Sequence, residues 1–438
     1  MEDVSLLHGG SPQSAEIQKP DPSPIQRLPP EILAEIFSLV VHSTFHWRDI
    51  GPVSHQAPCV FARVARRWAE VALGTPALWS MVFLDLDRVG VRGSVPLTKL
   101  LHERSKNMPL TVKISCEQPE SDTHVVLDTV MSHAERWVVA DIYIMFPLFH
   151  QLTTIRNRLS ALTILEITLH LGDDIDSEVD AGLWDTFAVA PALTAVHATF
   201  GDDHHLRYAR NPFTFPWHQL TRLSSTFLSN TEALSVLRKL SNIIECRLQY
   251  EEVETLPKNI VPARLPHLRS LLLMIAEELT EPEFIDETRI HSFSSSSLLH
   301  CLETPSLERL STYWAADEEA VLSLLARSDC FASLQHFCFR CASIISDNVL
   351  DIVQKMPRLT VLEIGEFNSG LHPHSSLHFV DALSSRWLAA RETDGPPRQT
   401  LRVRIVDRTT PELSLMQTDG LVIEISQYTH FPGLIPTH

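Results

Sequence analysis

The 438-residue sequence predicts an α/β protein in which a small N-terminal helical module is followed by a long array of alternating strands and helices. Two observations predict this class. Two short segments near the N-terminus have the apolar spacing of helices, and from residue 162 onward strand-like runs recur with helix-period segments between them. We therefore divide the chain into a disordered, Gly-, Ser- and Pro-containing tail (1–24), the helical module (25–80) and a repeat array (81–438).

The first helix of the module is predicted to begin at Pro29 and Pro30, because a residue without an N–H costs little in the first helical turn. Glu31 adds a favourable negative charge at this N-terminus. The apolar residues that follow have helical spacing and form one stripe: Ile32, Leu33, Ile36, Phe37 and Val40.

A second helix is predicted to carry a similar stripe and to end at Gly74 and Pro76. Its apolar side comprises Phe61, Val64, Ala65, Trp68 and Ala72, and its polar side comprises Arg63, Arg66, Arg67 and Glu70. A segment of about 60 residues is too small to bury a deep core of its own. We therefore expect the module to pack on the rest of the chain or to offer surplus apolar surface to a partner.

The order Leu-Pro, a Glu-Ile-Leu helix, Val-x-x-Arg-Trp and Pro-x-Leu-Trp resembles the F-box family, in particular the F-box-like proteins of fungi. The matching residues are Leu28, Pro29, Glu31, Ile32, Leu33, Ile36, Phe37, Val64, Arg67, Trp68, Pro76, Leu78 and Trp79. The resemblance implies that the module binds the Skp-type adaptor of a cullin-RING ubiquitin ligase. The residues expected to contact the adaptor are Leu28, Pro29, Ile32, Leu33, Ile36, Phe37, Val64 and Trp68.

One segment departs from the family pattern. Ser43 to Pro58 is polar and aromatic, whereas the family has a short link with apolar residues, so we expect the middle helix to be distorted or replaced by a loop. The alternative to adaptor binding is that the module only packs against the rest of the protein. The two differ in whether Leu28, Ile32, Ile36 and Trp68 present a shared apolar face to solvent.

The repeat array is predicted from eight runs with the pattern apolar-x-x-apolar-x-apolar, some with polar substitutions. They are Leu162, Leu165, Ile167; Leu193, Val196, Ala198; Leu220, Leu223, Ser225; Ile243, Cys246, Leu248; Leu268, Leu271, Leu273; Leu307, Leu310, Thr312; Leu334, Phe337, Phe339; and Leu359, Leu362, Ile364. Successive runs start between 23 residues (Leu220 to Ile243) and 39 residues (Leu268 to Leu307) apart. Leucine-rich repeats have a period of about 20–29 residues. We therefore expect an irregular leucine-rich-repeat solenoid, with an ordinary mixed α/β domain as the alternative.

Other elements complete this array. Helices are predicted at Thr231–Leu240, Asp317–Ser328 and Ser346–Met356, each of which starts with a residue able to cap a helix. Further strands are predicted at Leu78–Leu86, Met108–Ser115, Thr400–Val406 and Leu421–Ser426, with Trp137, Ala140 and Ile142 as one earlier repeat. A polar insertion at Glu281–Ser297 accounts for the longest spacing.

Residues that alternate with the buried positions of each strand should share the concave face of such a solenoid, where a protein substrate would bind. They are Glu166, Thr168, His197, Thr199, Ser224, Thr226, Arg247, Gln249, Leu272, Met274, Ser311, Tyr313, Cys338, Arg340 and Glu363. The polar and charged contacts expected for a substrate are Glu166, His197, Arg247, Gln249, Tyr313, Arg340 and Glu363. Ordinary solvated strand residues would have the same pattern.

Composition argues against several other classes of protein. The net charge of −18 disfavours nucleic-acid binding, and no apolar run is long enough to span a bilayer. Seven cysteines without regular spacing favour reduced thiols. We expect an intracellular protein, in the cytoplasm, the nucleus or both.

Catalytic and metal-binding motifs are weak. Cys338 and Cys341 have the spacing of half a zinc site, but no second pair of ligands follows at a suitable distance. Asp202–His205 and His372–His374 are interpreted as loops, and no phosphate-loop, dinucleotide, nucleophile-elbow or zinc-protease motif occurs. We therefore expect no cofactor and no metal.

These observations lead to one functional hypothesis and two alternatives. The chain is interpreted as the non-catalytic substrate receptor of an SCF-type (Skp-cullin-F-box) ubiquitin ligase. The main alternative is a leucine-rich protein-interaction scaffold that is not linked to ubiquitination. A hydrolase would require a constellation of titratable residues in a pocket, which the sequence does not show.

Overall fold

The computed structural model describes thirteen stretches of the chain and two single positions. They are residues 24–43, 57–87, 91–117, 124–170, 181–201, 213–252, 260–275, 298–313, 318–341, 347–366, 401–407, 414–418 and 421–427, together with 256 and 383. The predicted tail at 1–24 lies almost entirely outside these residues, as do most of Ser43–Pro58 and the insertion Glu281–Ser297.

The N-terminal part of the structure is helical. After the short turn η1 (Pro24–Arg27), it contains α1 (Pro30–Ser43), α2 (Ala57–Val64), α3 (Arg66–Gly74) and η4 (Pro76–Trp79). The start of α1 at Pro30, with Glu31 in its first turn, confirms the prediction from the Pro-Pro-Glu sequence.

The prediction of a single second helix is wrong, because Ala65 separates α2 from α3 with an extended backbone (φ −157°, ψ 155°). This break allows two aromatic rings, one from each helix, to contact the same ring of α1. Phe61 and Trp68 both pack on Phe37, with ring centroids 4.2 and 4.9 Å away, and are themselves 6.3 Å apart. In a continuous helix, residues seven apart are separated by about 10.5 Å along the axis.

Most strands in the described residues after the helical part belong to one large, mostly parallel sheet. Its 14 strands have the order β1-β2-β3-β4-β5-β6-β7-β9-β11-β12-β13-β14-β16-β15, so neighbouring strands follow one another along the chain almost throughout. The strands are β1 (Met81–Asp85), β2 (Leu110–Cys116), β3 (Trp137–Met145), β4 (Ile164–His170), β5 (Ala195–Gly201), β6 (Arg222–Ser229), β7 (Glu245–Glu252), β9 (Ser270–Ile275), β11 (Arg309–Tyr313), β12 (His336–Cys341), β13 (Val361–Glu366), β14 (Leu401–Asp407), β15 (Ser414–Thr418) and β16 (Leu421–Gln427).

Strand β15 is the exception to the parallel arrangement, since it pairs antiparallel with β16 at the end of the sheet. A separate two-stranded parallel sheet joins β8 (Ala263–Arg264) and β10 (Leu302–Glu303). The strands expected near the N-terminus, at 400–406 and at 421–426 are present, whereas β15 was not predicted.

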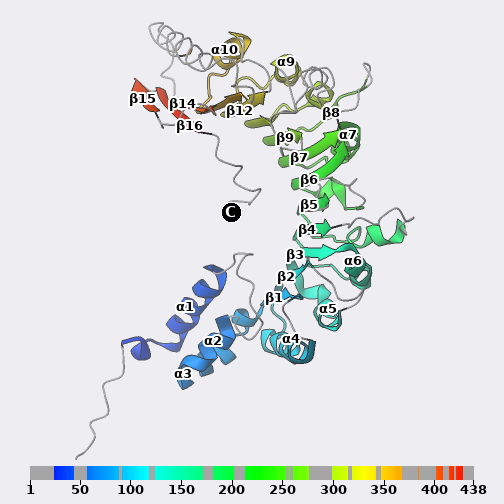
Figure 1. The fold of residues 1–438 in the computed structure, drawn as a ribbon, viewed down its shortest axis with the longest axis vertical. Helices are drawn as coiled ribbons and strands as arrows, with labels where there is room; N and C mark the ends of the chain where they lie inside the picture. The colour runs from blue at the N-terminus through cyan, green and yellow to red at the C-terminus, as the bar shows by residue number, and fades with distance from the viewer. Residues whose placement is uncertain are drawn as a thin grey trace, which may run out of the picture.

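The segments between strands cover one face of the sheet. They include α4 (Val91–Ser105), α5 (Val125–Met131), α6 (Phe146–Leu152), α7 (Asn230–Leu237), α9 (Glu318–Ser328) and α10 (Asp347–Gln354). Figure 1 shows the sheet following an arc, with these helices on its outer side. We call the inner side the concave face. The three predicted helices are present, although α7 is capped by Ser229, whose hydroxyl accepts a hydrogen bond from the Glu232 N–H at 3.4 Å.

The connections on either side of β5 contain short turns in the described residues, η7 (Ala181–Asp185) and η8 (Trp217–Gln219). Aromatic side chains fill the space beside them. Phe213, which precedes η8, packs against Trp184 and Phe149 with ring centroids 5.3 and 5.2 Å away.

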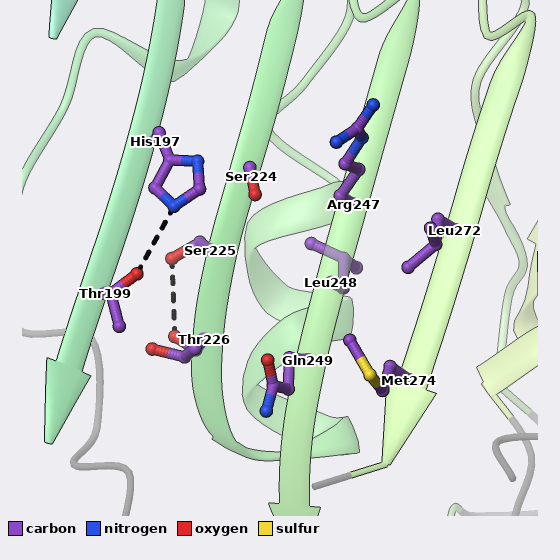
Figure 2. Close-up of a pocket in the computed structure, with 10 residues that line it drawn as sticks. All are labelled: His197, Thr199, Ser224, Ser225, Thr226, Arg247, Leu248, Gln249, Leu272 and Met274. Atoms are coloured by element: carbon purple, nitrogen blue, oxygen red, sulfur yellow. Dashed lines mark hydrogen bonds between the residues drawn. The ribbon is translucent and has the colours of Figure 1, made fainter. Parts of the chain in front are cut away.

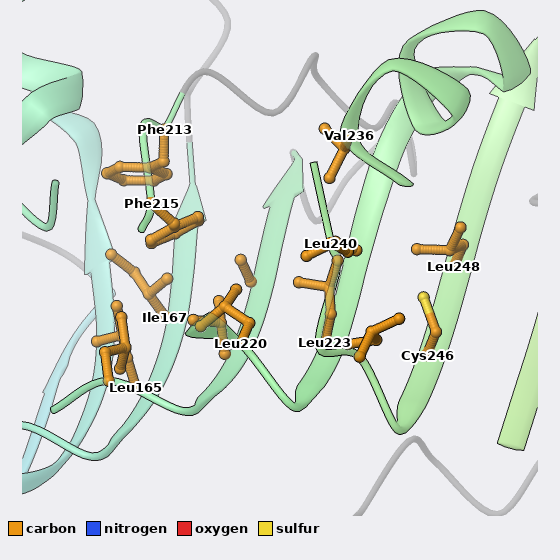
Figure 3. Packing of buried hydrophobic residues seen from close by; sticks show 14 of the residues in the cluster. Leu165, Ile167, Phe213, Phe215, Leu220, Leu223, Val236, Leu240, Cys246 and Leu248 are labelled. Atoms are coloured by element: carbon orange, nitrogen blue, oxygen red, sulfur yellow. The ribbon is translucent and has the colours of Figure 1, made fainter. Parts of the chain in front are cut away.

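The core lies between the sheet and these outer segments (Figure 3). All 24 positions of the eight predicted runs are buried, with exposed fractions of 0–4%. The middle residues of the runs lie opposite one another across eight strands, from Leu165 through Val196, Leu223, Cys246, Leu271, Leu310 and Phe337 to Leu362. The protein is thus an α/β protein whose parallel sheet buries one face. No helix in the described residues has the length and apolarity to cross a membrane.

Candidate functional sites

Helix α1 is apolar on two adjacent faces, and only one of them is used by the protein's own core. Leu33, Phe37 and Val41 lie one turn apart and are 0–3% exposed. The neighbouring face comprises Ile32, Ile36, Leu39 and Val40, which are 48%, 36%, 62% and 37% exposed. The single stripe predicted from the sequence is therefore two faces with different roles.

Helix α2 adds two more exposed apolar side chains, Val60 (44%) and Val64 (57%). We refer to the six exposed residues of α1 and α2 as the module surface: Ile32, Ile36, Leu39, Val40, Val60 and Val64. Large apolar side chains that gather on one small unit in this way are typical of an interaction surface, whereas single exposed ones are ordinary.

The residues predicted to contact an adaptor fall into three groups. Pro29, Ile32, Ile36 and Val64 are exposed, and Leu28 and Trp68 are half-buried. Leu33 and Phe37 are buried within the chain, at 0% and 1% exposure. Leu39, Val40 and Val60 belong to the exposed set but were not predicted to contact an adaptor. Extending the helical period from Ile32 by seven residues would have found Leu39.

The Leu-Pro turn and the Arg-Trp motif meet in space. The Arg67 guanidinium donates a hydrogen bond to the carbonyl oxygen of Leu28, which ties the entry of α1 to α3. Trp68 follows Arg67 and completes the aromatic cluster with Phe37 and Phe61. Residues of the sequence motif therefore make contacts inside the module, whereas the residues of the module surface are exposed to solvent.

The helical module also packs on the first strands of the sheet. The indole N–H of Trp79 donates a hydrogen bond to the Ala72 carbonyl oxygen at 2.7 Å, and the Trp79 side chain is 1% exposed. Leu33, Phe37 and Trp79 belong to the same continuous core as the sheet residues. The module is therefore both attached to the sheet and apolar on its free side.

The concave face is the second candidate site, because the predicted outward residues form a continuous row there. Directly opposite one another lie Glu166, His197, Ser224, Arg247, Leu272, Ser311, Cys338 and Glu363. Two of the predicted outward residues cannot be counted as exposed. Cys338 is 1% exposed and cannot contact a substrate in this conformation, and the side chain of Arg340 lies outside the described part of the structure.

The row continues toward β2 with charged residues. Lys113 on β2 and Asp141 on β3 form an ion pair at 2.5 Å, and Asp141 lies opposite Glu166 on β4. Tyr313, on the other side, is half-buried on β11. The predicted contacts thus extend over most of the sheet, and the structure brings only some of them into one place.

A shallow hollow forms where β5, β6, β7 and β9 run side by side (Figure 2). We call it the Arg247 hollow; it is lined by His197, Thr199, Ser224, Ser225, Thr226, Arg247, Leu248, Gln249, Leu272 and Met274. Eight of these residues were predicted to face outward. Ser225 and Leu248 were instead assigned to the core.

The hollow encloses about 10 Å³, which is roughly the space of one water molecule. Pockets for drug-sized molecules are about 300–1,000 Å³. The hollow is therefore a shallow depression in the sheet surface, over which side chains of a partner can lie, and it cannot bury a small-molecule substrate.

His197 and Arg247 dominate the electrostatics of the hollow. Burial lowers the pKa of His197 below its usual value, and the nearby Arg247 charge lowers it further, against a weaker opposite effect of Asp141. His197 is therefore neutral at pH 7, and its Nε2 lies 3.4 Å from the Thr199 hydroxyl. Arg247 itself is exposed on β7.

The described residues contain no cluster of three or more His, Cys, Asp or Glu side chains able to hold a metal ion. Cys338 is buried on β12, and Cys341 ends that strand. Asp202–His205 and His372–His374 lie outside the described residues.

Comparisons with known proteins give no family assignment. No protein-family model matches the chain, and no curated protein sequence is detectably similar to it. The function must therefore be inferred from the two surfaces.

Proposed function

We propose that this chain is the substrate-receptor subunit of an SCF-type ubiquitin ligase. In this proposal the F-box-like module (25–80) binds the Skp adaptor, and a leucine-rich-repeat-like solenoid (81–438) binds a protein substrate on its concave face. The chain is not itself an enzyme. It acts in the cytoplasm or nucleus by holding the substrate near the ligase, which raises the substrate's effective concentration at the transfer site.

The observation that carries the proposal is the second apolar face of α1. A helix that only packed against the rest of the module would need one apolar face, and α1 already buries Leu33, Phe37 and Val41 there. Ile32, Ile36 and Leu39 remain exposed beside them. An apolar face that the chain's own core does not use favours a partner.

The expected affinity follows from the exposed area. Full burial of a large apolar side chain is worth about 1.5–3 kcal/mol. Because the six residues of the module surface are 36–62% exposed, a partner would bury about half of each, for roughly 6 kcal/mol in total. Association costs about 4–15 kcal/mol. A stable complex therefore requires most of the six residues together, with further contacts from residues such as Pro29.

The main alternative is a leucine-rich scaffold without a ligase, in which the helical module caps the solenoid. The observation in its favour is the joint at Trp79, whose side chain belongs to the core that the module shares with the sheet. This joint explains one face of the module. It does not explain Ile36 and Leu39.

The deciding experiment is a calorimetric titration of the Skp adaptor into the full-length chain and two variants. Ile36→Asp places a charge in the module surface, and a charge buried without a partner is costly. Val261→Asp is the matched control, because Val261 is 77% exposed and lies outside the module. We expect tight binding by the parent and by Val261→Asp, and loss of binding by Ile36→Asp.

Both substituted positions are exposed, so a loss of binding can be attributed to the surface and not to unfolding of the module. Trp68→Ala would remove part of the aromatic cluster and destabilise the module, so lost binding would have two explanations. No binding by the parent at tens of micromolar adaptor, about 6 kcal/mol of binding free energy, would refute the ligase role and leave the scaffold.

A further inference from the structure

The Arg247 hollow has a charge pattern that indicates which kind of substrate peptide it accepts. Arg247 is the one charged residue of its ten lining residues at neutral pH, because His197 stays neutral. The remaining polar side chains are hydroxyls and the Gln249 amide. The hollow is thus locally positive on a chain whose net charge is −18.

Arg247 is available to a partner because its nearest carboxylate neighbour on β7 is engaged elsewhere. Glu245 lies two residues earlier on the same strand, and its carboxylate pairs with Arg309 of β11 at 3.5 Å. Arg222 of β6 lies directly opposite Glu245 and provides a second positive charge there. In the described part of the chain, Arg247 makes no hydrogen bond or ion pair.

Apolar side chains lie on one side of Arg247. Leu272 on β9 is its direct cross-strand neighbour, and Met274 lies opposite Gln249 on the same strand. Tyr313 on β11 follows next to Met274. All three are half-buried, so each still offers surface to a ligand. The other side of Arg247, toward β6 and β5, is polar.

The spacing of these groups fits an extended chain that crosses the strands. Adjacent strands are about 4.8 Å apart, and two residues of an extended peptide span about 6.7 Å. A peptide side chain above Arg247 on β7 therefore places the next side chain on the same side between β9 and β11. Leu272 and Met274 on β9 and Tyr313 on β11 flank that position.

We propose that the Arg247 hollow binds an extended peptide in which an anionic side chain contacts Arg247 and an apolar side chain two residues away lies over Leu272 and Met274. The anion is a carboxylate or a phosphate, since a guanidinium recognises both through charge-assisted hydrogen bonds. This inference rests on the proposed function in one respect: the peptide would be a segment of the ligase substrate held on this face.

The test uses labelled synthetic peptide mixtures and fluorescence anisotropy with the full-length chain. Each mixture is random except for two positions: a central phosphoserine, Glu, Ser or Arg, and a Leu two residues before or after it. We expect the phosphoserine or Glu mixtures to bind about tenfold or more tightly than the Ser mixtures, as for a hydrogen bond to a charged group. Comparison of phosphoserine with Glu identifies the source of the anion.

Variants locate the effect on the hollow. Arg247→Ala is expected to abolish the preference for an anion, and Arg247→Lys to restore part of it. Met274→Asp is expected to abolish the preference for Leu while the anion preference remains. The matched control is Arg104→Ala, because Arg104 is exposed on α4, on the outer side of the arc. Equal binding of the Ser, Glu and phosphoserine mixtures, or an anion preference that survives Arg247→Ala, overturns the inference.

The peptide test and the adaptor titration fail independently. A chain that binds the adaptor but shows no anion preference retains the ligase role and loses this inference. A chain that binds anionic peptides through Arg247 but no adaptor retains this surface and loses the ligase role, which leaves the scaffold.

Discussion

Two neighbouring residues of α1, Phe37 and Ile36, provide a direct test of the division of this helix into a buried and an exposed face. Phe37 is 1% exposed, stacks on Phe61 and packs at a tilt against Trp68, whereas Ile36 is 36% exposed. Truncation of a buried Phe to Ala costs about 3–5 kcal/mol. Aromatic pairs are worth about 0.5–1.5 kcal/mol each beyond the burial of their area. Phe37→Ala should therefore destabilise the helical module by about 4 kcal/mol.

Ile36→Ala is expected to change the same quantity by less than about 1 kcal/mol, because the side chain is partly solvated and Ala is the better helix former. Hydrogen–deuterium exchange of the α1–α3 amides is the suitable assay, since it reports the free energy of local opening. About 4 kcal/mol corresponds to roughly a thousandfold faster exchange. Similar exchange rates in the two variants would refute the assignment of the two faces.

Three other predictions concern the core. His102 is 5% exposed, and burial, with His133 and Arg136 nearby, lowers its pKa to about 3. As the pH falls below about 6.5, His102 therefore becomes protonated in the unfolded chain but not in the folded one. The free energy of unfolding then declines by about 1.4 kcal/mol per pH unit toward pH 3. His102→Leu should reduce that slope in urea denaturation between pH 7.5 and 5, and an unchanged slope would contradict the assignment. Trp79→Phe leaves the Ala72 carbonyl without its 2.7 Å hydrogen bond and should cost about 1–3 kcal/mol in thermal unfolding; a stability equal to the parent would contradict a contribution of this bond to the module. Burial raises the pKa of Cys330 to about 11, so iodoacetamide at pH 8 should label it only after denaturation. Labelling of the native chain would show that the thiol is accessible.

The strands were predictable because each repeats the same local rule. In the run Leu271–Leu273, as in the other runs, alternate residues are buried and share a register with the neighbouring strands. This alternation can be recognised within a few consecutive residues, without reference to residues distant in the chain. The same rule identified Arg247 and Gln249 as outward residues of β7.

The features that were missed depend on tertiary contacts. The sequence from Phe61 to Ala72 keeps a helical period, and only the joint packing of Phe61 and Trp68 on Phe37 accounts for the break at Ala65. Likewise, apolar spacing shows that α1 is amphipathic but not which of two adjacent apolar faces the core takes. The position of the Arg247 hollow could not be predicted because every strand has a similar alternation, and the relief depends on which side chains become neighbours.

The order of strands has a consequence for how the protein is made. Nearly every described strand pairs with one that precedes it in the chain, so its partner has already left the ribosome when it emerges. Each new strand can be added to an existing edge and bury its apolar residues at once. Strand β15 cannot pair when it is synthesised, because its partner β16 follows it in the chain. The same is true of β8, whose partner β10 follows it. This strand order permits the sheet to grow from β1 during translation, with its antiparallel end completed last.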